Sequence, residues 1–218
     1  MNNSPKWYTC TPVRFAGDRT FFARDSGLLC KGFQEIGIEC KVIMPGPRMD
    51  CDQTEDLIRT DYRNLEDPEW WRSLGAEGVV LYGWGSGKYV KIVKAIKQAD
   101  LYLVSNMDTT GILGVFNGFS EYGSSLWRVS MGEATSKPAG MLRYLLRFAY
   151  SATLAVFRND IGRARHLKQA DLIGAITPIG MERIRKVCRF LGGEVLANRV
   201  KLIPHACASY PTSLRKDS

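Results

Sequence analysis

Residues 78–105, GVVLYGWGSGKYVKIVKAIKQADLYLVS, decide the fold. The stretch opens with an unbroken apolar run, residues 78–82, which is typical of a strand buried on both faces. A glycine-rich turn follows, and residues 88–98 then repeat apolar side chains at helical spacing. Residues 101–105 again have the composition of a buried strand. A strand, a helix and a second strand in this order predict a parallel crossover unit.

The same alternation continues on both sides of this unit. Further strands are predicted at residues 7–13, 39–44, 171–176 and 200–203. Four more helices are predicted between them. The first ends at Gly37 and turns inward Phe22, Leu28, Leu29, Phe33 and Ile36. The others are a short helix from Asp67 to Gly75, one around residues 141–157, and one from Thr177 to Gly192-Gly193.

We therefore predict an α/β fold, a Rossmann-like doubly wound sheet that is mostly parallel and carries helices on both faces. Ligands of such sheets bind at the carboxyl ends of the strands. The candidate site is accordingly formed by the loops at residues 14–18, 83–87 and 106–111.

Charge and cysteine content narrow the class of protein. The formal net charge of +8 favours an anionic partner, whether nucleic acid, acidic lipid or a phosphate-bearing ligand. The six cysteines lie far apart without a C-x-x-C pair, so we expect reduced thiols in a cytosolic protein and neither a disulfide scaffold nor a zinc site. Residues 1–6 are polar and no apolar stretch follows them, so a secretory signal is not expected.

Three common site motifs are incomplete in this sequence. Gly85-Ser86-Gly87-Lys88 suggests a P-loop, but Tyr82 stands where the first glycine is needed. Gly83-x-Gly85-x-x-Lys88 lacks the third glycine of a dinucleotide fingerprint. Gly118-Phe119-Ser120 is followed by Tyr122 instead of the glycine of a hydrolase elbow. The usual signatures of NTPases, dehydrogenases and hydrolases are therefore missing.

Three stretches do match a known family in the right order. They are LLCKGFQEIGIECKVIMP at residues 28–45, LKQADLIGAITP at residues 167–178 and RVKLIPHA at residues 199–206. Together they resemble the N-terminal domain of GT-B glycosyltransferases, especially retaining family 4. Each stretch is moderately specific, and the resemblance spans nearly the whole chain.

The resemblance implies transfer of a sugar from a nucleotide-sugar donor to a saccharide or lipid-linked acceptor, with retained stereochemistry. It implies no cofactor beyond that co-substrate and no essential metal. Residues 1–205 would be the acceptor-side domain, and residues 206–218 would lead toward a C-terminal domain that binds the donor. That domain, in cis or in trans, would be needed for activity.

The resemblance also assigns the site residues. Ala16, Gly17 and Asp18 fall on the family's donor-phosphate loop, which usually carries Gly-Gly. After the fourth strand the family places His-Asp, and this chain has Met107-Asp108, which makes Asp108 the catalytic candidate and leaves the histidine role unfilled.

The acceptor-binding candidates are Trp84, Gly85, Ser86 and Thr109, because an aromatic face suits a sugar ring. Each loop also fits a plain turn between a strand and a helix.

The segment at residues 141–168 is strongly apolar and carries six basic residues against one acid. Arg143 and Arg147 interrupt it, so it cannot span a bilayer. Either it lies in a membrane interface, at the inner face of a cytoplasmic membrane, or it packs on the sheet with its arginines in water.

Two other functions compete with the glycosyltransferase. One is a stand-alone Rossmann-like nucleotide-binding oxidoreductase, and the other is a non-catalytic protein that binds a membrane or nucleic acid. Under the leading hypothesis no nucleic-acid partner is expected.

Overall fold

The structure is a computed structural model that describes residues 4–53, 55–107, 119–133, 136–153 and 161–203. Within these residues seven strands form one sheet in the order β3-β2-β1-β4-β5-β6-β7, and every pairing is parallel. The strands are β1 (Lys6–Cys10), β2 (Glu39–Pro45), β3 (Leu57–Thr60), β4 (Gly78–Leu81), β5 (Tyr102–Met107), β6 (Leu172–Ala175) and β7 (Val200–Leu202). The predicted doubly wound α/β sheet is confirmed.

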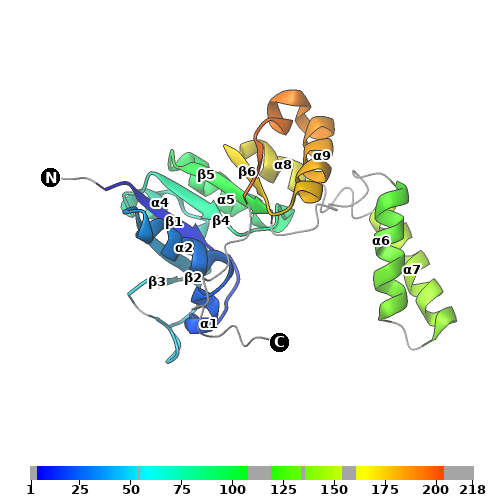
Figure 1. Cartoon of the computed structure of the whole chain (residues 1–218), viewed down its shortest axis with the longest axis horizontal. Helices are drawn as coiled ribbons and strands as arrows, with labels where there is room; N and C mark the ends of the chain where they lie inside the picture. Colours follow the sequence, from blue (N-terminus) through cyan, green and yellow to red (C-terminus); the bar gives the residue numbers. More distant parts are fainter. Residues whose placement is uncertain (1–3, 54, 108–118, 134–135, 154–160, 204–218) are drawn as a thin grey trace, which may run out of the picture.

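Helices cover both faces of the sheet (Figure 1). The helical segments are α1 (Arg19–Phe22), α2 (Asp25–Glu35), α3 (Tyr62–Leu65), α4 (Pro68–Ser73), η1 (Gly87–Tyr89), α5 (Val90–Gln98), α6 (Phe119–Gly132), α7 (Lys137–Ala152), α8 (Ile161–Gln169) and α9 (Pro178–Ala197). Because parallel crossovers are right-handed, strands added on opposite sides of β1 place their helices on opposite faces.

The two faces have separate cores. On one face, Trp71 of α4, Ile92 of α5 and Leu167 of α8 are fully buried in a cluster that includes Leu81 and Leu103 of the sheet. On the other, α1 and α2 bury Phe22 and Cys30 against Val42 and Met44. The alternation of side chains along each strand supplies both clusters.

The first helix differs from the prediction. It is divided into α1 and α2, and the division is tight, since a side chain at Gly27 would meet the backbone of Phe21 and Phe22. The expectation that Ile36 turns inward is wrong: its side chain is 73% exposed, because α2 ends at Glu35 and Ile36 follows as its C-cap.

Two strands also differ from the prediction, whereas the break in the last helix agrees with it. Strand β3 was not predicted, and the first strand ends at Cys10, before Pro12, instead of at Val13. The last helix is interrupted at Gly192-Gly193 as predicted, because both glycines have non-helical backbone and Gly193 has a φ of +68°. Glycine accommodates this conformation because it has no Cβ. A further short helical stretch, included in α9, then runs to Ala197.

Helices α6 and α7 form a hairpin that stands away from the sheet (Figure 1). Tyr144 of α7 packs its ring on Trp127 of α6 with a centroid distance of 5.1 Å, and the Tyr122 hydroxyl donates to Ser151 Oγ at 2.8 Å. Leu145 and Leu146 are 56% and 64% exposed, so this segment does not pack on the sheet. No helix within the described residues combines the length and the apolar character needed to cross a membrane.

The cysteines in the described ranges are free thiols, as predicted. Cys10, Cys30, Cys40 and Cys188 are buried, and Cys51 is exposed. Burial raises the pKa of the Cys188 thiol to about 12 and that of Cys10 still further, so these groups serve as small apolar core residues.

Candidate functional site

A cavity of about 380 Å³ opens between the carboxyl ends of β1 and β4. These two neighbours are the strands from which the order runs outward in opposite directions, which is the topological switch point where doubly wound sheets bind ligands. We call it the switch-point cavity. Its lining residues are Thr11, Phe15, Ala16, Asp18, Thr20, Phe21, Arg24, Tyr82 and Trp84. The fold thus brings together the loops at residues 14–18 and 83–87.

Trp84 reaches this cavity from a tight turn. It has a φ of +49° and is followed by Gly85 at +58°, so two successive residues adopt left-handed backbone. A side chain at Gly85 would collide with Met107, which explains the glycine on packing grounds. The Ser86 hydroxyl accepts from the Lys88 amide at 3.3 Å and caps η1. Gly85 and Ser86 therefore shape the turn, and Trp84 is the residue that lines the cavity.

His166 anchors the same turn from beneath. Its Nδ1–H donates to the Ser86 carbonyl oxygen at 3.0 Å, and because that oxygen only accepts, Nε2 is left to accept from the Ser105 hydroxyl at 2.8 Å. His166 is fully buried, and burial lowers its pKa to about 4, so the ring is neutral at physiological pH. The sequence did not single it out, because it lies in a basic helix where only burial marks it as different.

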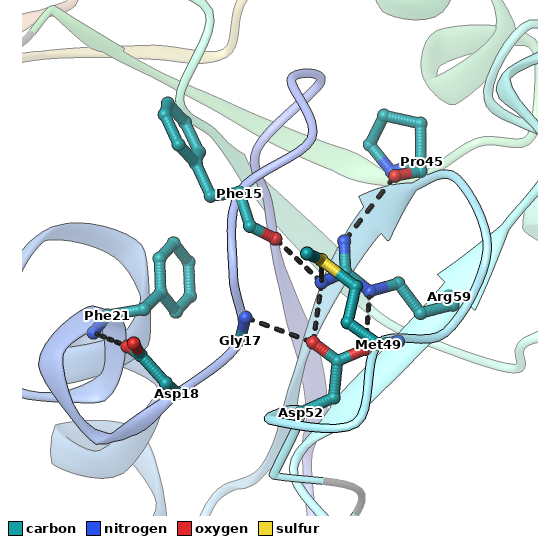
Figure 2. A network of polar contacts seen from close by, with 8 residues as sticks. All are labelled: Phe15, Gly17, Asp18, Phe21, Pro45, Met49, Asp52 and Arg59. Atoms are coloured by element: carbon teal, nitrogen blue, oxygen red, sulfur yellow. Dashed lines mark hydrogen bonds and ion pairs between the residues drawn. The ribbon is translucent and has the colours of Figure 1, made fainter.

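The loop at residues 14–18 is held by a buried ion pair between Asp52 and Arg59 (Figure 2). Arg59 Nε donates to Asp52 Oδ2 at 2.9 Å and Nη2 donates to Oδ1 at 2.6 Å, a two-pronged geometry that favours strong pairing. Nη2 also donates to the Phe15 carbonyl at 2.6 Å, and Asp52 Oδ1 accepts from the Gly17 amide at 3.0 Å. The bond from Arg59, the largest contribution, holds the pKa of Asp52 at about 2.

The three residues predicted for a donor-phosphate loop have different surroundings. Ala16 and Asp18 line the switch-point cavity, and one carboxylate oxygen of Asp18 caps α1 by accepting from the Phe21 amide at 3.0 Å. The amide of Gly17 is engaged by Asp52. A Cβ at Gly17 would come within 2.8 Å of Asp52 Oδ1, so the glycine is also explained by packing. A donor-phosphate role for this loop stays a prediction.

A second cavity of about 880 Å³ lies at the carboxyl ends of β2 and β3. We call it the arginine cavity, since three arginines line it. The complete lining is Arg14, Pro45, Gly46, Pro47, Arg48, Asp52, Leu57, Arg59, Thr60, Asp61 and Tyr62. The Asp52–Arg59 pair forms part of its wall, so one ion pair links the two cavities.

Polar side chains also tie β1 to α2 beneath the switch-point cavity. The Thr9 hydroxyl donates to the Ser26 carbonyl at 3.1 Å, and the hydroxyls of Thr11 and Ser26 lie 2.7 Å apart. Ser26 is fully buried and Thr11 lines the cavity. The floor of the cavity is therefore fixed to the start of α2.

Two candidates, Asp108 and Thr109, lie outside the described residues. Met107, directly before them, ends β5 and is fully buried. The described residues hold no group of three or more histidine, cysteine or carboxylate side chains that could bind a metal ion.

No family model matches the chain, and no curated protein matches it. Among solved structures, the crystal structure of LpCGTa in complex with UDP is similar, with 12% identity and a TM-score of 0.49. The alignment covers 92% of this chain and 54% of that one, so the present chain spans about half its length.

Proposed function

We propose that this chain is the acceptor-side domain of a retaining glycosyltransferase. It would present a saccharide or lipid-linked acceptor to a nucleotide-sugar donor that is held by a C-terminal domain, in cis or in trans. The observation that carries the proposal is the switch-point cavity, with Trp84 in its wall, in a chain whose sequence resembles the N-terminal half of GT-B enzymes.

The groups around this cavity suit a saccharide. The rings of Tyr82 and Trp84 offer apolar faces on which a pyranose can stack. Asp18 and the hydroxyls of Thr11 and Thr20 offer acceptors and donors for sugar hydroxyls. This combination of apolar faces with a few polar groups is typical of small-ligand sites.

The chemistry at the donor would be electrostatic. The departing diphosphate requires backbone N–H groups or a helix N-terminus to stabilise its charge. We assign the orientation of the reacting hydroxyls to Asp108, and acceptor contact to Thr109 beside it. Closure of a second domain over the carboxyl edge would exclude water from the transfer.

We also propose that the α6–α7 hairpin rests on the inner face of a cytoplasmic membrane. Its exposed apolar side chains are Trp127, Val129, Met141, Leu142, Leu145, Leu146 and Tyr150. Both of its described acids are paired, Glu121 with Arg183 at 2.5 Å and Glu133 with Arg147 at 2.9 Å. Arg128 and Lys137 have no ion-pair partner among the described residues, and an apolar surface with such cations suits anionic lipid.

Two assays test the proposed function. Saccharide binding, followed by NMR of the whole chain, should weaken at least about tenfold in Trp84→Ala, whereas Trp127→Ala in the hairpin should bind like the unchanged chain. Residues 1–218 alone should show no sugar transfer from nucleotide-sugar donors, and transfer should appear when the C-terminal domain is joined. Robust transfer by the isolated chain would refute the half-site arrangement. Quenching of NAD(P)H fluorescence would favour the oxidoreductase.

A further inference from the structure

We propose that the arginine cavity binds a phosphate group of the acceptor through Arg14 and Arg48. That the phosphate belongs to a sugar acceptor rests on the proposed function. The binding of phosphate itself rests on the geometry of the cavity alone.

The charges in this cavity do not cancel. Arg59 is neutralised by Asp52, and both side chains are almost completely buried. Arg14 and Arg48 line the same cavity with exposed side chains, and neither has an ion-pair partner among the residues that the structure describes. The remaining carboxylate, Asp61, caps α3 by accepting from the Arg63 amide at 3.0 Å. Two guanidinium groups therefore face one carboxylate that is already engaged.

The aliphatic part of the Arg14 side chain is restrained by the backbone at Gly46. The backbone at Gly46 has a φ of +101°, and a Cβ there would come within 3.0 Å of Arg14 Cδ. The aliphatic part of Arg14 thus lies directly against the chain at Gly46. The Gly46 amide donates to the Thr60 carbonyl at 2.9 Å, which fixes this support to β3. A guanidinium with a restrained stem loses less conformational freedom on binding.

The cavity also supplies a neutral hydrogen-bond donor. Tyr62 lines it, and burial, the largest cause, raises the pKa of its phenol, so the hydroxyl remains protonated and can donate. Planar guanidinium groups pair with phosphate oxygens through two parallel bonds. At about 880 Å³ the cavity has room for a phosphate together with the group that carries it.

The test measures binding of inorganic phosphate and of glycerol 3-phosphate to the whole chain by calorimetry. The double variant Arg14→Gln, Arg48→Gln should weaken both by at least about tenfold. Arg19→Gln together with Lys94→Gln is the matched control: it also removes two positive charges, from exposed positions on α1 and α5 that line neither cavity, and should change affinity less than about twofold. Unchanged thermal unfolding verifies that the exposed substitutions preserve the fold.

Equal binding by the double variant and the unchanged chain would overturn the inference, and so would an equal loss in the matched control, which would indicate a non-specific charge effect. A parallel series uses vesicles that contain phosphatidic acid. Loss of vesicle binding only in the double variant supports a lipid phosphate as the source, and loss of glycerol 3-phosphate binding alone supports a soluble one. Arginine-dependent phosphate binding, with no sugar transfer even after the C-terminal domain is joined, would reject the glycosyltransferase and keep this site. Transfer by the joined protein to phosphate-bearing acceptors that does not depend on either arginine would keep the glycosyltransferase and reject this site.

Discussion

The Nδ1–H of His166 donates to the carbonyl oxygen of Ser86 at 3.0 Å, and this bond connects a fully buried helix residue to the turn that carries Trp84. The turn contains two successive residues with positive φ, a conformation that needs support from its surroundings. His166 is consequently a positioning residue for the wall of the switch-point cavity.

Stability should depend on pH through His166. The pKa of the folded state is about 4, against an ordinary value of 6.5, so between these values the unfolded chain binds a proton that the folded chain does not. The free energy of unfolding should therefore fall as the pH is lowered from 6.5 toward 4, by up to about 3 kcal/mol. Urea unfolding at several pH values measures it.

The control for this effect is His166→Gln, which removes the titrating group. The variant should be less stable at pH 7 but should lose the slope between pH 6.5 and 5. Parallel pH profiles for the variant and the unchanged chain would mean that His166 is not the titrating group.

Asp52→Asn should lower the free energy of unfolding by about 3 kcal/mol, because it leaves the buried Arg59 guanidinium without its counter-charge. Asp50→Asn, at an exposed neighbouring position, should change it by less than about 0.5 kcal/mol. Adding Arg59→Met to Asp52→Asn should recover part of the loss. A double variant as unstable as Asp52→Asn would argue that an uncompensated charge is not the cause. The pH dependence that Asp52 contributes lies below that of His166, between its ordinary pKa of 3.8 and its folded-state pKa of about 2.

Gly17→Ala should destabilise the chain by about 1–3 kcal/mol, since a methyl group there meets Leu57 and the fixed carboxylate of Asp52. Gly32→Ala is the opposite case: it lies within α2 with nothing near its Cβ position and should stabilise by about 0.5–1 kcal/mol. Denaturant unfolding of both variants compares them directly. Equal effects at the two sites would contradict the packing argument.

Membrane contact by the hairpin can be measured by sedimentation with vesicles that contain phosphatidylglycerol. Leu145→Glu together with Leu146→Glu should reduce the bound fraction at least about fivefold, because both side chains are exposed and would have to bury charge in lipid. Ile36→Glu, at a position that is 73% exposed and lies on the sheet domain, should have no effect. If all variants sediment alike, the hairpin is not the membrane contact.

The sequence was sufficient for the sheet because buried parallel strands are nearly continuous apolar runs, as in Gly78–Leu81. It failed for β3 because Leu57–Thr60 is a short edge strand that includes Arg59, and such a segment has the composition of a loop. The position of the α6–α7 hairpin was also not predictable, since its apolar residues would look the same if they were packed on the sheet.

For the site, the strand ends predicted which loops to consider, and Ala16, Asp18 and Trp84 of those loops line one cavity, while the roles assigned to them stay predictions. The residues that hold those loops were missed. Asp52 and Arg59 are seven positions apart in a polar stretch without a motif, and their pairing arises only when β3 joins the sheet. Interactions between distant segments of this kind leave no local pattern for a sequence to display.

The Asp52–Arg59 pair has a consequence for recognition. Arg59 donates to the Phe15 carbonyl on one side, and its Nη1 lies 3.5 Å from the Pro45 carbonyl oxygen on the other. A single guanidinium thus stiffens the wall between the switch-point cavity and the arginine cavity. A ligand that enters either cavity therefore meets a preorganised surface. Binding then does not include the entropic cost of ordering that surface, and affinity depends more strongly on small differences in the shape of the ligand.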